Sequence, residues 1–147
     1  METSDVESDD EEEFQNEEDF KALEVQHYQS LIHMNFSNLF PNLKYFDEKQ
    51  NTKKGQYDTQ EIGIMDFLTI DEEENTFVVI ELKRSTSDKT IGQILRYMGW
   101  VKQNLSKNNQ KVKGLIVGVS KDNKFDYALS MTSNIVFKTM KLNITIS

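Results

Sequence analysis

The chain has 147 residues, enough for one domain with a buried core, and a formal net charge of −8 at pH 7. It has no cysteine and only two histidines, which excludes disulfide staples, thiolate zinc sites and histidine-rich metal sites. Any metal must therefore be held by oxygen ligands. No apolar run is long enough to cross a bilayer and the first residues are acidic, unlike a signal peptide, so we expect a cytoplasmic protein without membrane association.

The negative charge is concentrated at the N-terminus. Residues 1–20 contain 11 acids and no lysine or arginine, which leaves 14 acids, 17 bases and a net charge of +3 in residues 21–147. Because residues 1–16 hold few apolar groups to offset their ordering entropy, we expect a disordered acidic tail, followed by a folded domain over residues 17–147. The tail either only solubilises the protein, or it competes with nucleic acid for basic surface or docks on a partner.

Helical periodicity predicts a first helix over residues 17–39, with acidic residues in its first turn. A short strand is predicted over residues 43–48, followed by a polar loop over residues 49–57. This loop carries a basic cluster that is either simply solvated or makes phosphate contacts. We take Lys53 and Lys54 as candidate nucleic-acid-binding residues.

Two apolar strands come next, joined by a short acidic hairpin. Residues 62–70 form a strand interrupted by Asp66, and residues 76–83 are apolar on both faces until Glu81 and Lys83, as in a strand at the middle of a sheet. Side chains alternate along a strand, so Glu81 and Lys83 share a face. Pairing through the hairpin lets Asp66 and Glu81 converge on one point.

A helix is predicted over residues 89–106, with Tyr97 and Trp100 on the side opposite its core face. The two rings either stack on bases, form a homodimer or partner-protein contact, or pack under a loop. The expected core stripe of this helix is apolar: Ile91, Ile94, Leu95, Met98, Val101 and Leu105. Gln93 and Arg96 lie on the same side as the two rings.

The remaining chain predicts a crossover strand over residues 113–120, a short helix over 125–131, and strands over 134–138 and 142–146. Together these elements predict an α/β fold, a central mixed β-sheet flanked by helices.

The charged groups at the end of the central strands suggest chemistry. Two carboxylates, Asp66 and Glu81, supply the hard oxygen ligands that suit Mg²⁺ or Mn²⁺. The metal would acidify a bound water, and Lys83 would hold or deprotonate that water and offset developing charge. The alternative is a buried Asp66–Lys83 ion pair without catalysis, although burying three charged groups for stability alone is costly.

Three segments carry a family resemblance: GIMD (Gly63–Asp66), VVIELKR (Val78–Arg84) and IGQILRYMGW (Ile91–Trp100), with KGLIV (Lys113–Val117) also fitting. With these segments, the chain resembles the PD-(D/E)xK nuclease superfamily and in particular the NucS-type endonuclease catalytic domain. The resemblance covers roughly residues 23–137 and implies a restriction-endonuclease-like core.

This resemblance also implies roles for individual residues. It implies that Asp66 and Glu81 bind metal together with the Leu82 carbonyl, and that Lys83 serves the nucleophilic water. Gln93 matches the family's active-site glutamine, and Arg96 and Tyr97 fall in the same motif, as candidate nucleic-acid-binding residues. The first helix of the family often contributes an acid to the metal site, and Glu24 is the candidate here.

We therefore expect a Mg²⁺- or Mn²⁺-dependent endonuclease that hydrolyses DNA phosphodiesters in repair, restriction or defence. A rival hypothesis is a non-catalytic member of the same fold that binds nucleic acid or a protein. A third possibility is that RNA is cut, and the sequence does not decide between DNA and RNA.

Overall fold

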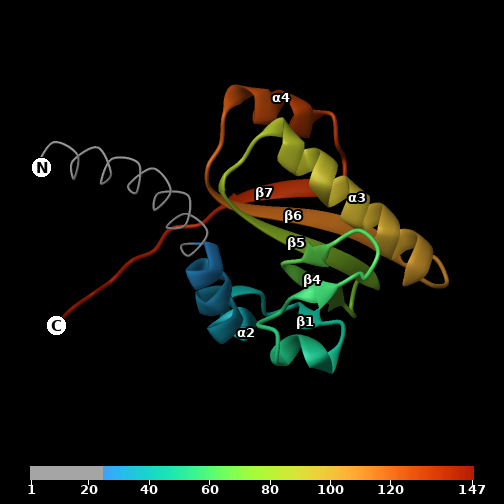
Figure 1. Ribbon diagram of the computed structural model, residues 1–147, viewed down its shortest axis with the longest axis horizontal. Coiled ribbons are helices and arrows are strands. Elements are labelled where there is room, and N and C mark those ends of the chain that lie inside the picture. Colours follow the sequence, from blue (N-terminus) through green and yellow to red (C-terminus); the bar gives the residue numbers. More distant parts are fainter. Residues whose placement is uncertain (1–24) are drawn as a thin grey trace, which may run out of the picture.

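The computed structural model describes residues 25–147 (Figure 1). The acidic tail, the predicted start of the first helix and Glu24 lie outside this range. The described part of the first helix spans residues 25–34. The other elements, in chain order, are α2 (Phe36–Leu39), β1 (Lys44–Tyr45), η1 (Glu48–Asn51), β2 (Tyr57–Asp58), β3 (Ile64–Met65), β4 (Phe67–Asp71), β5 (Thr76–Ser85), α3 (Asp88–Asn104), β6 (Lys111–Ser120), α4 (Asn123–Ser130) and β7 (Ile135–Thr139).

Five strands form a mixed sheet in the order β1-β4-β5-β6-β7, and β2 and β3 form a separate two-stranded hairpin. β4 runs antiparallel to β1 and β5, whereas β5, β6 and β7 are mutually parallel. Parallel neighbours need crossover connections, which α3 and α4 supply. The predicted mixed sheet flanked by helices is confirmed, with the long strands β5 and β6 at its centre.

Each face of the sheet has its own apolar cluster, because β5 is apolar on both sides. Figure 1 shows α3 and α4 over one face, with the first helix and α2 on the other side. The cluster under α3 includes Met65, Leu68, Phe77, Val79, Ile94, Tyr97 and Phe125. The cluster under the first helix includes Ile32, Phe36, Phe67, Ile80, Leu82 and Val117.

The α3 helix is rotated relative to its predicted orientation. Most of the expected core stripe is buried, but Leu95 is 44 % exposed and Tyr97 is only 6 % exposed. The prediction that Tyr97 lies opposite the core face of this helix is therefore wrong, because Tyr97 belongs to the buried cluster under α3. The reason is that the β2–β3 hairpin covers this side of the helix, where the Tyr97 hydroxyl donates to the Ile64 carbonyl at 3.0 Å.

Two predicted strands are shorter or absent. The strand predicted over residues 43–48 is limited to β1, because the Asp47 side chain accepts from the Lys49 N–H and starts η1 instead. Residues 142–146 were expected to form a strand, but they have no regular structure, and Ile144 and Ile146 are more than 80 % exposed. Their alternating pattern finds no strand to pair with in the described part of the chain.

Within residues 25–147, no helix is long and apolar enough to span a membrane.

Candidate functional site

The strand predicted over residues 62–70 is broken at Asp66, between β3 and β4. Met65 packs in the cluster under α3, whereas Phe67 packs in the cluster under the first helix. In an unbroken strand, residues two apart share a face, so the chain must change its course at Asp66. At this break Asp66 lies outside the paired strands, directly before β4 begins.

The structure holds Asp66 at three points. Its backbone N–H donates to Glu81 Oε1 at 3.3 Å, and its carboxylate Oδ2 accepts from the Leu82 N–H at 2.8 Å. Its backbone carbonyl accepts from Gln29 Nε2 at 2.8 Å. These contacts bring Asp66 and Glu81 together, the convergence that the sequence predicts.

The Asp66 and Glu81 carboxylates form an electrostatically coupled pair. Glu81 is 2 % exposed. Burial, followed by the charge of Asp66, raises the pKa of Glu81 from 4.5 to about 9. Burial also raises the pKa of Asp66, although the hydrogen bond from Leu82 opposes this change. A buried and a partly buried carboxylate, adjacent and both of raised pKa, form an arrangement typical of a functional site, since a nearby cation would relieve their repulsion.

Lys83 lies two residues beyond Glu81 on the same face of β5 and is partly buried. Its positive charge lowers the pKa of both carboxyl groups, so it lies near the pair. Among the described residues, however, the ion pairs within 4.0 Å do not include one from Lys83 to Asp66 or Glu81. The alternative of a closed Asp66–Lys83 ion pair is therefore not what the structure contains.

The α3 helix brings a second set of side chains to this pair. The pKa of Tyr97 is raised by burial and then by the charges of Glu81 and Asp66, whereas a hydrogen bond with Gln93 and the charge of Arg96 oppose the rise. Tyr97 thus lies close enough to the pair to interact with it electrostatically, and Gln93 and Arg96 lie close to Tyr97. Gln93 is partly buried and Arg96 is exposed, as expected of residues at the edge of a site.

The aromatic face of α3 is covered by the β2–β3 hairpin. Trp100 Nε1 donates to Glu61 Oε2 at 3.0 Å, and the Trp100 ring lies 6.0 Å from the Tyr57 ring, centroid to centroid. Gly63 makes the close approach possible, since a Cβ there would lie 2.8 Å from the Tyr97 hydroxyl. For Tyr97, packing under a loop is confirmed, and Trp100, which stays partly exposed, contacts the same hairpin. Tyr97 has no free ring surface for stacking on a base.

On the other side of Asp66, the first helix and a lysine-bearing loop enclose a cavity of about 350 Å³. We call residues 52–56 the lysine loop. The cavity is lined mainly by polar residues: Val25, Gln26, Gln29, Thr52, Lys53, Lys54, Gln56 and Asp66. Lys53 and Lys54, which are both exposed, therefore lie at the rim of a cavity that Asp66 also lines.

The donor set fits a hard divalent cation. Asp66 and Glu81 supply carboxylate oxygens, and the chain has no thiol to compete. A strand residue directs its N–H and C=O toward the same neighbour, so the Leu82 carbonyl faces the side on which the Leu82 N–H meets Asp66. Within residues 25–147, no third histidine or acidic residue joins Asp66 and Glu81 in a group that could hold a metal ion.

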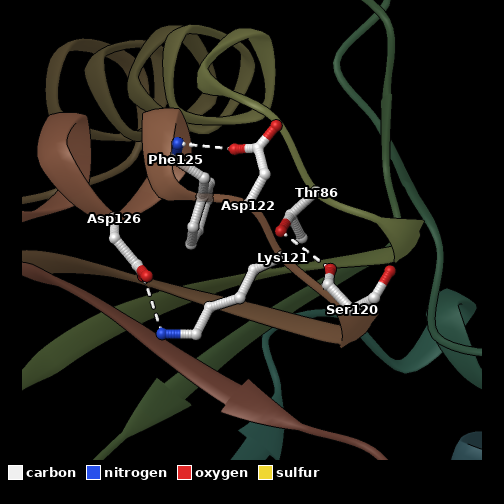
Figure 2. A network of polar contacts seen from close by, with 6 residues as sticks. All are labelled: Thr86, Ser120, Lys121, Asp122, Phe125 and Asp126. Atoms are coloured by element: carbon white, nitrogen blue, oxygen red, sulfur yellow. Dashed lines mark hydrogen bonds and ion pairs between the residues drawn. The ribbon is translucent and has the colours of Figure 1, made fainter.

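Beyond Lys83, a polar network fixes the ends of the two central strands (Figure 2). The Thr86 hydroxyl donates to the Ser120 carbonyl at 2.9 Å, and the Asp122 side chain caps α4 by accepting from the Phe125 N–H at 2.7 Å. Lys121 pairs with Asp126 at 2.6 Å. This network joins the β5–α3 and β6–α4 junctions, so the strand end that carries Lys83 is held in place.

Comparison with known proteins places the fold in a family. A family model described as the endonuclease NucS C-terminal domain matches residues 33–144. The chain belongs to this family. The comparison with curated proteins found no match.

Two solved structures are similar to this NucS-family chain. A chain in an EndoMS–dsDNA2 complex has 21 % sequence identity and a TM-score of 0.57, and the match covers 78 % of this chain and 43 % of that one. A repair endonuclease from Pyrococcus abyssi has 25 % identity and a TM-score of 0.47, with 74 % and 46 % covered. The EndoMS similarity shows the fold. The chain spans less than half of either solved chain.

Sequence reasoning missed Gln29, whose buried amide contacts the Asp66 carbonyl directly. The family resemblance points instead to an acid of the first helix, Glu24, which lies outside the described residues. The only sequence signal for Gln29 is its place between Tyr28 and Leu31, where a polar residue approaches the buried side of a helix.

Proposed function

We propose that this chain is a divalent-metal-dependent endonuclease domain that hydrolyses DNA phosphodiester bonds. One observation carries the proposal: Asp66 and Glu81, both with raised pKa values, converge on adjoining strands beside Lys83 in a NucS-family fold. DNA as the substrate class is supported by the endonuclease description of the family and by the double-stranded DNA in the EndoMS complex.

Each side chain would have a distinct task. Asp66 and Glu81 would hold Mg²⁺ or Mn²⁺, with the Leu82 carbonyl as a third ligand. The bound cation would supply Lewis-acid chemistry and a more acidic water. Lys83 would orient or deprotonate the attacking water and offset charge that develops on the phosphate, and Gln93 would help to orient the reacting groups from α3.

Lys53, Lys54 and Arg96 would contact the phosphate backbone on opposite sides of the carboxylate pair. Their exposure suits such contacts, and the net charge of +3 in residues 21–147 would tolerate a polyanion. Tyr97 does not belong to this set, because it is buried under the hairpin.

The test is cleavage of plasmid DNA, single-stranded DNA and RNA, each with Mg²⁺, Mn²⁺ or EDTA. The wild type should cleave DNA only with metal, and Lys83→Ala should reduce the rate about 10²–10⁴-fold, the usual contribution of a proton-transfer group. Lys113→Ala is the matched control, since Lys113 is exposed on β6.

Equal activity in the wild type and in Lys83→Ala would overturn the proposal. Cleavage of RNA but not DNA would keep the chemistry and change the substrate. Binding of DNA without any cleavage would favour the non-catalytic alternative.

A further inference from the structure

Two buried glutamine amides fasten the lysine loop to the strand segment that contains Asp66. Gln29, on the first helix, is 5 % exposed, and its Nε2 donates to the Lys54 carbonyl at 2.7 Å and to the Asp66 carbonyl at 2.8 Å. Gln50, on η1, is 2 % exposed, and its Nε2 donates to the Gly55 carbonyl at 2.7 Å and to the Leu68 carbonyl at 2.9 Å.

The two amides repeat one arrangement. Each amide donates to one carbonyl of the lysine loop, Lys54 for Gln29 and Gly55 for Gln50. Each also donates to one carbonyl near the start of β4, Asp66 for Gln29 and Leu68 for Gln50. A primary amide has two N–H groups, and each glutamine uses both of them on backbone acceptors. The side-chain orientation is therefore fixed, because the flipped amide would set its own oxygen against two carbonyl oxygens.

These side-chain hydrogen bonds take the place of backbone pairing between the lysine loop and the residues around Asp66. Lys54 and Gly55 have positive φ angles of 54° and 91°, so the loop cannot continue a ladder there. Asp66 lies between two strands, and among residues 25–147 the donor to its carbonyl is the Gln29 side chain and not a backbone N–H. Buried carbonyls need a donor, and here the donor comes from Gln29.

The two glutamines differ in what they hold. Gln50 reaches Leu68, whose side chain is packed in the apolar cluster under α3. Gln29 reaches Asp66, whose carboxylate faces Glu81 and the Leu82 N–H. The loss of either amide loosens the same loop, but only the loss of Gln29 releases the backbone of a carboxylate in the candidate metal centre.

We propose that Gln29 is a positioning residue of the metal centre: its amide sets the backbone of Asp66 and ties it to the loop that carries Lys53 and Lys54. Gln29 acts through Asp66 and touches neither the cation nor the nucleic acid. This inference rests on the proposed function, because it assigns Gln29 to the metal site of that function. Partners that orient a metal ligand commonly affect metal affinity 10–100-fold.

The experiment compares Gln29→Met with Gln50→Met, since methionine keeps the length and lacks the donors. Urea unfolding in EDTA should give a loss of stability for Gln50→Met at least as large as that for Gln29→Met, because Gln50 Oε1 also accepts from the Asp47 N–H. Titration with Mn²⁺, followed by the rise in melting temperature, should then separate them. Gln29→Met should need about 10-fold or more Mn²⁺ for the half-maximal rise, whereas Gln50→Met should stay within about 2-fold of the wild type.

A milder variant keeps the test valid if Gln29→Met lacks a cooperative transition. Gln29→Asn retains the amide on a shorter side chain. Its half-maximal rise in melting temperature should require a higher Mn²⁺ concentration than that of Gln50→Met. Equal half-maximal concentrations for the Gln29 and Gln50 variants would overturn the inference.

The failure of this inference is distinguishable from the failure of the nuclease proposal. A wild type that binds Mn²⁺ through Asp66 but cleaves nothing would remove the nuclease function and leave the role of Gln29 in place. A wild type without any Mn²⁺-induced rise would overturn both.

Discussion

Glu81 and Lys83 project from the carboxyl-terminal half of a long paired strand, whereas Asp66 lies where a strand is interrupted. The β5–α3 side of the site is held by regular hydrogen-bond ladders and by a helix packed on the sheet. The side formed by residues 46–66 contains only two-residue strands and a short 3-10 helix, and it is held by side-chain amides. The two sides meet at the carboxylate pair. The contrast shows that one half of the site depends on periodic structure and the other on a few individual hydrogen bonds and glycines.

The largest expected effect comes from Gly55→Ala on the irregular side. Gly55 has a φ of +91°, and an added Cβ would lie 2.2 Å from the Phe67 ring. Backbone strain and overpacking each cost about 1–3 kcal/mol, so the free energy of unfolding should fall by about 2–6 kcal/mol. Gly92→Ala on α3 is the matched control, since nothing lies within 4 Å of its added Cβ, and it should stabilise by about 0.5–1 kcal/mol.

Urea unfolding of both glycine variants measures this contrast. If Gly55→Ala is as stable as the wild type, the lysine loop is not the rigid element that its contacts indicate.

The sequence predicted the regular side well and the irregular side poorly. The apolar run of β5 and the helical period of α3 are local patterns, and both elements formed close to their predicted bounds. The break at Asp66 depends on Gln29, 37 residues earlier, and on Glu81, 15 residues later, so no local pattern encodes it. The rotation of α3 likewise depends on the β2–β3 hairpin, which has strands of two residues each.

For the candidate site, alternation along β5 and a short hairpin were enough to predict that Asp66 and Glu81 converge. The surroundings of the pair were not predictable, because the amide of Gln29 and the burial of Tyr97 come from residues far apart in sequence.

The second expected effect is a pH dependence of stability, which tests the pair where the two sides meet. The pKa of Glu81 is raised from 4.5 to about 9, so above about pH 4.5 the native state binds more protons than the unfolded chain. The free energy of unfolding of the metal-free protein should therefore fall as the pH rises toward 9. For a difference of one proton, the slope is about 1.4 kcal/mol per pH unit.

Urea unfolding in EDTA from pH 5 to pH 9 measures this slope. Glu81→Gln cannot titrate, so its stability should fall less over this range. Parallel pH profiles for the two proteins would mean that Glu81 is not held in the protonated form at neutral pH.

The smallest effect is expected for Tyr97→Phe, which removes one hydrogen bond between α3 and the hairpin. The Ile64 carbonyl loses its donor, which should cost about 1 kcal/mol of unfolding free energy. DNA affinity should stay unchanged, because the ring is buried. Tyr127→Phe is the control, since Tyr127 is 77 % exposed on α4 and should have no effect on stability.

If Tyr97→Phe lowers DNA affinity under conditions in which the variant remains folded, Tyr97 belongs to the nucleic-acid-binding residues after all.

The break at Asp66 also limits how the chain can vary in length. Met65 and Phe67 are anchored in apolar clusters on opposite faces of the sheet, with a single residue between them. Adding or removing one residue here would move an anchor to the wrong face, because side chains alternate along the strand. The exposed turn at residues 72–75 has no such anchors. Length changes in homologous chains should therefore collect in that turn and spare the three residues 65–67, whatever substitutions occur around them.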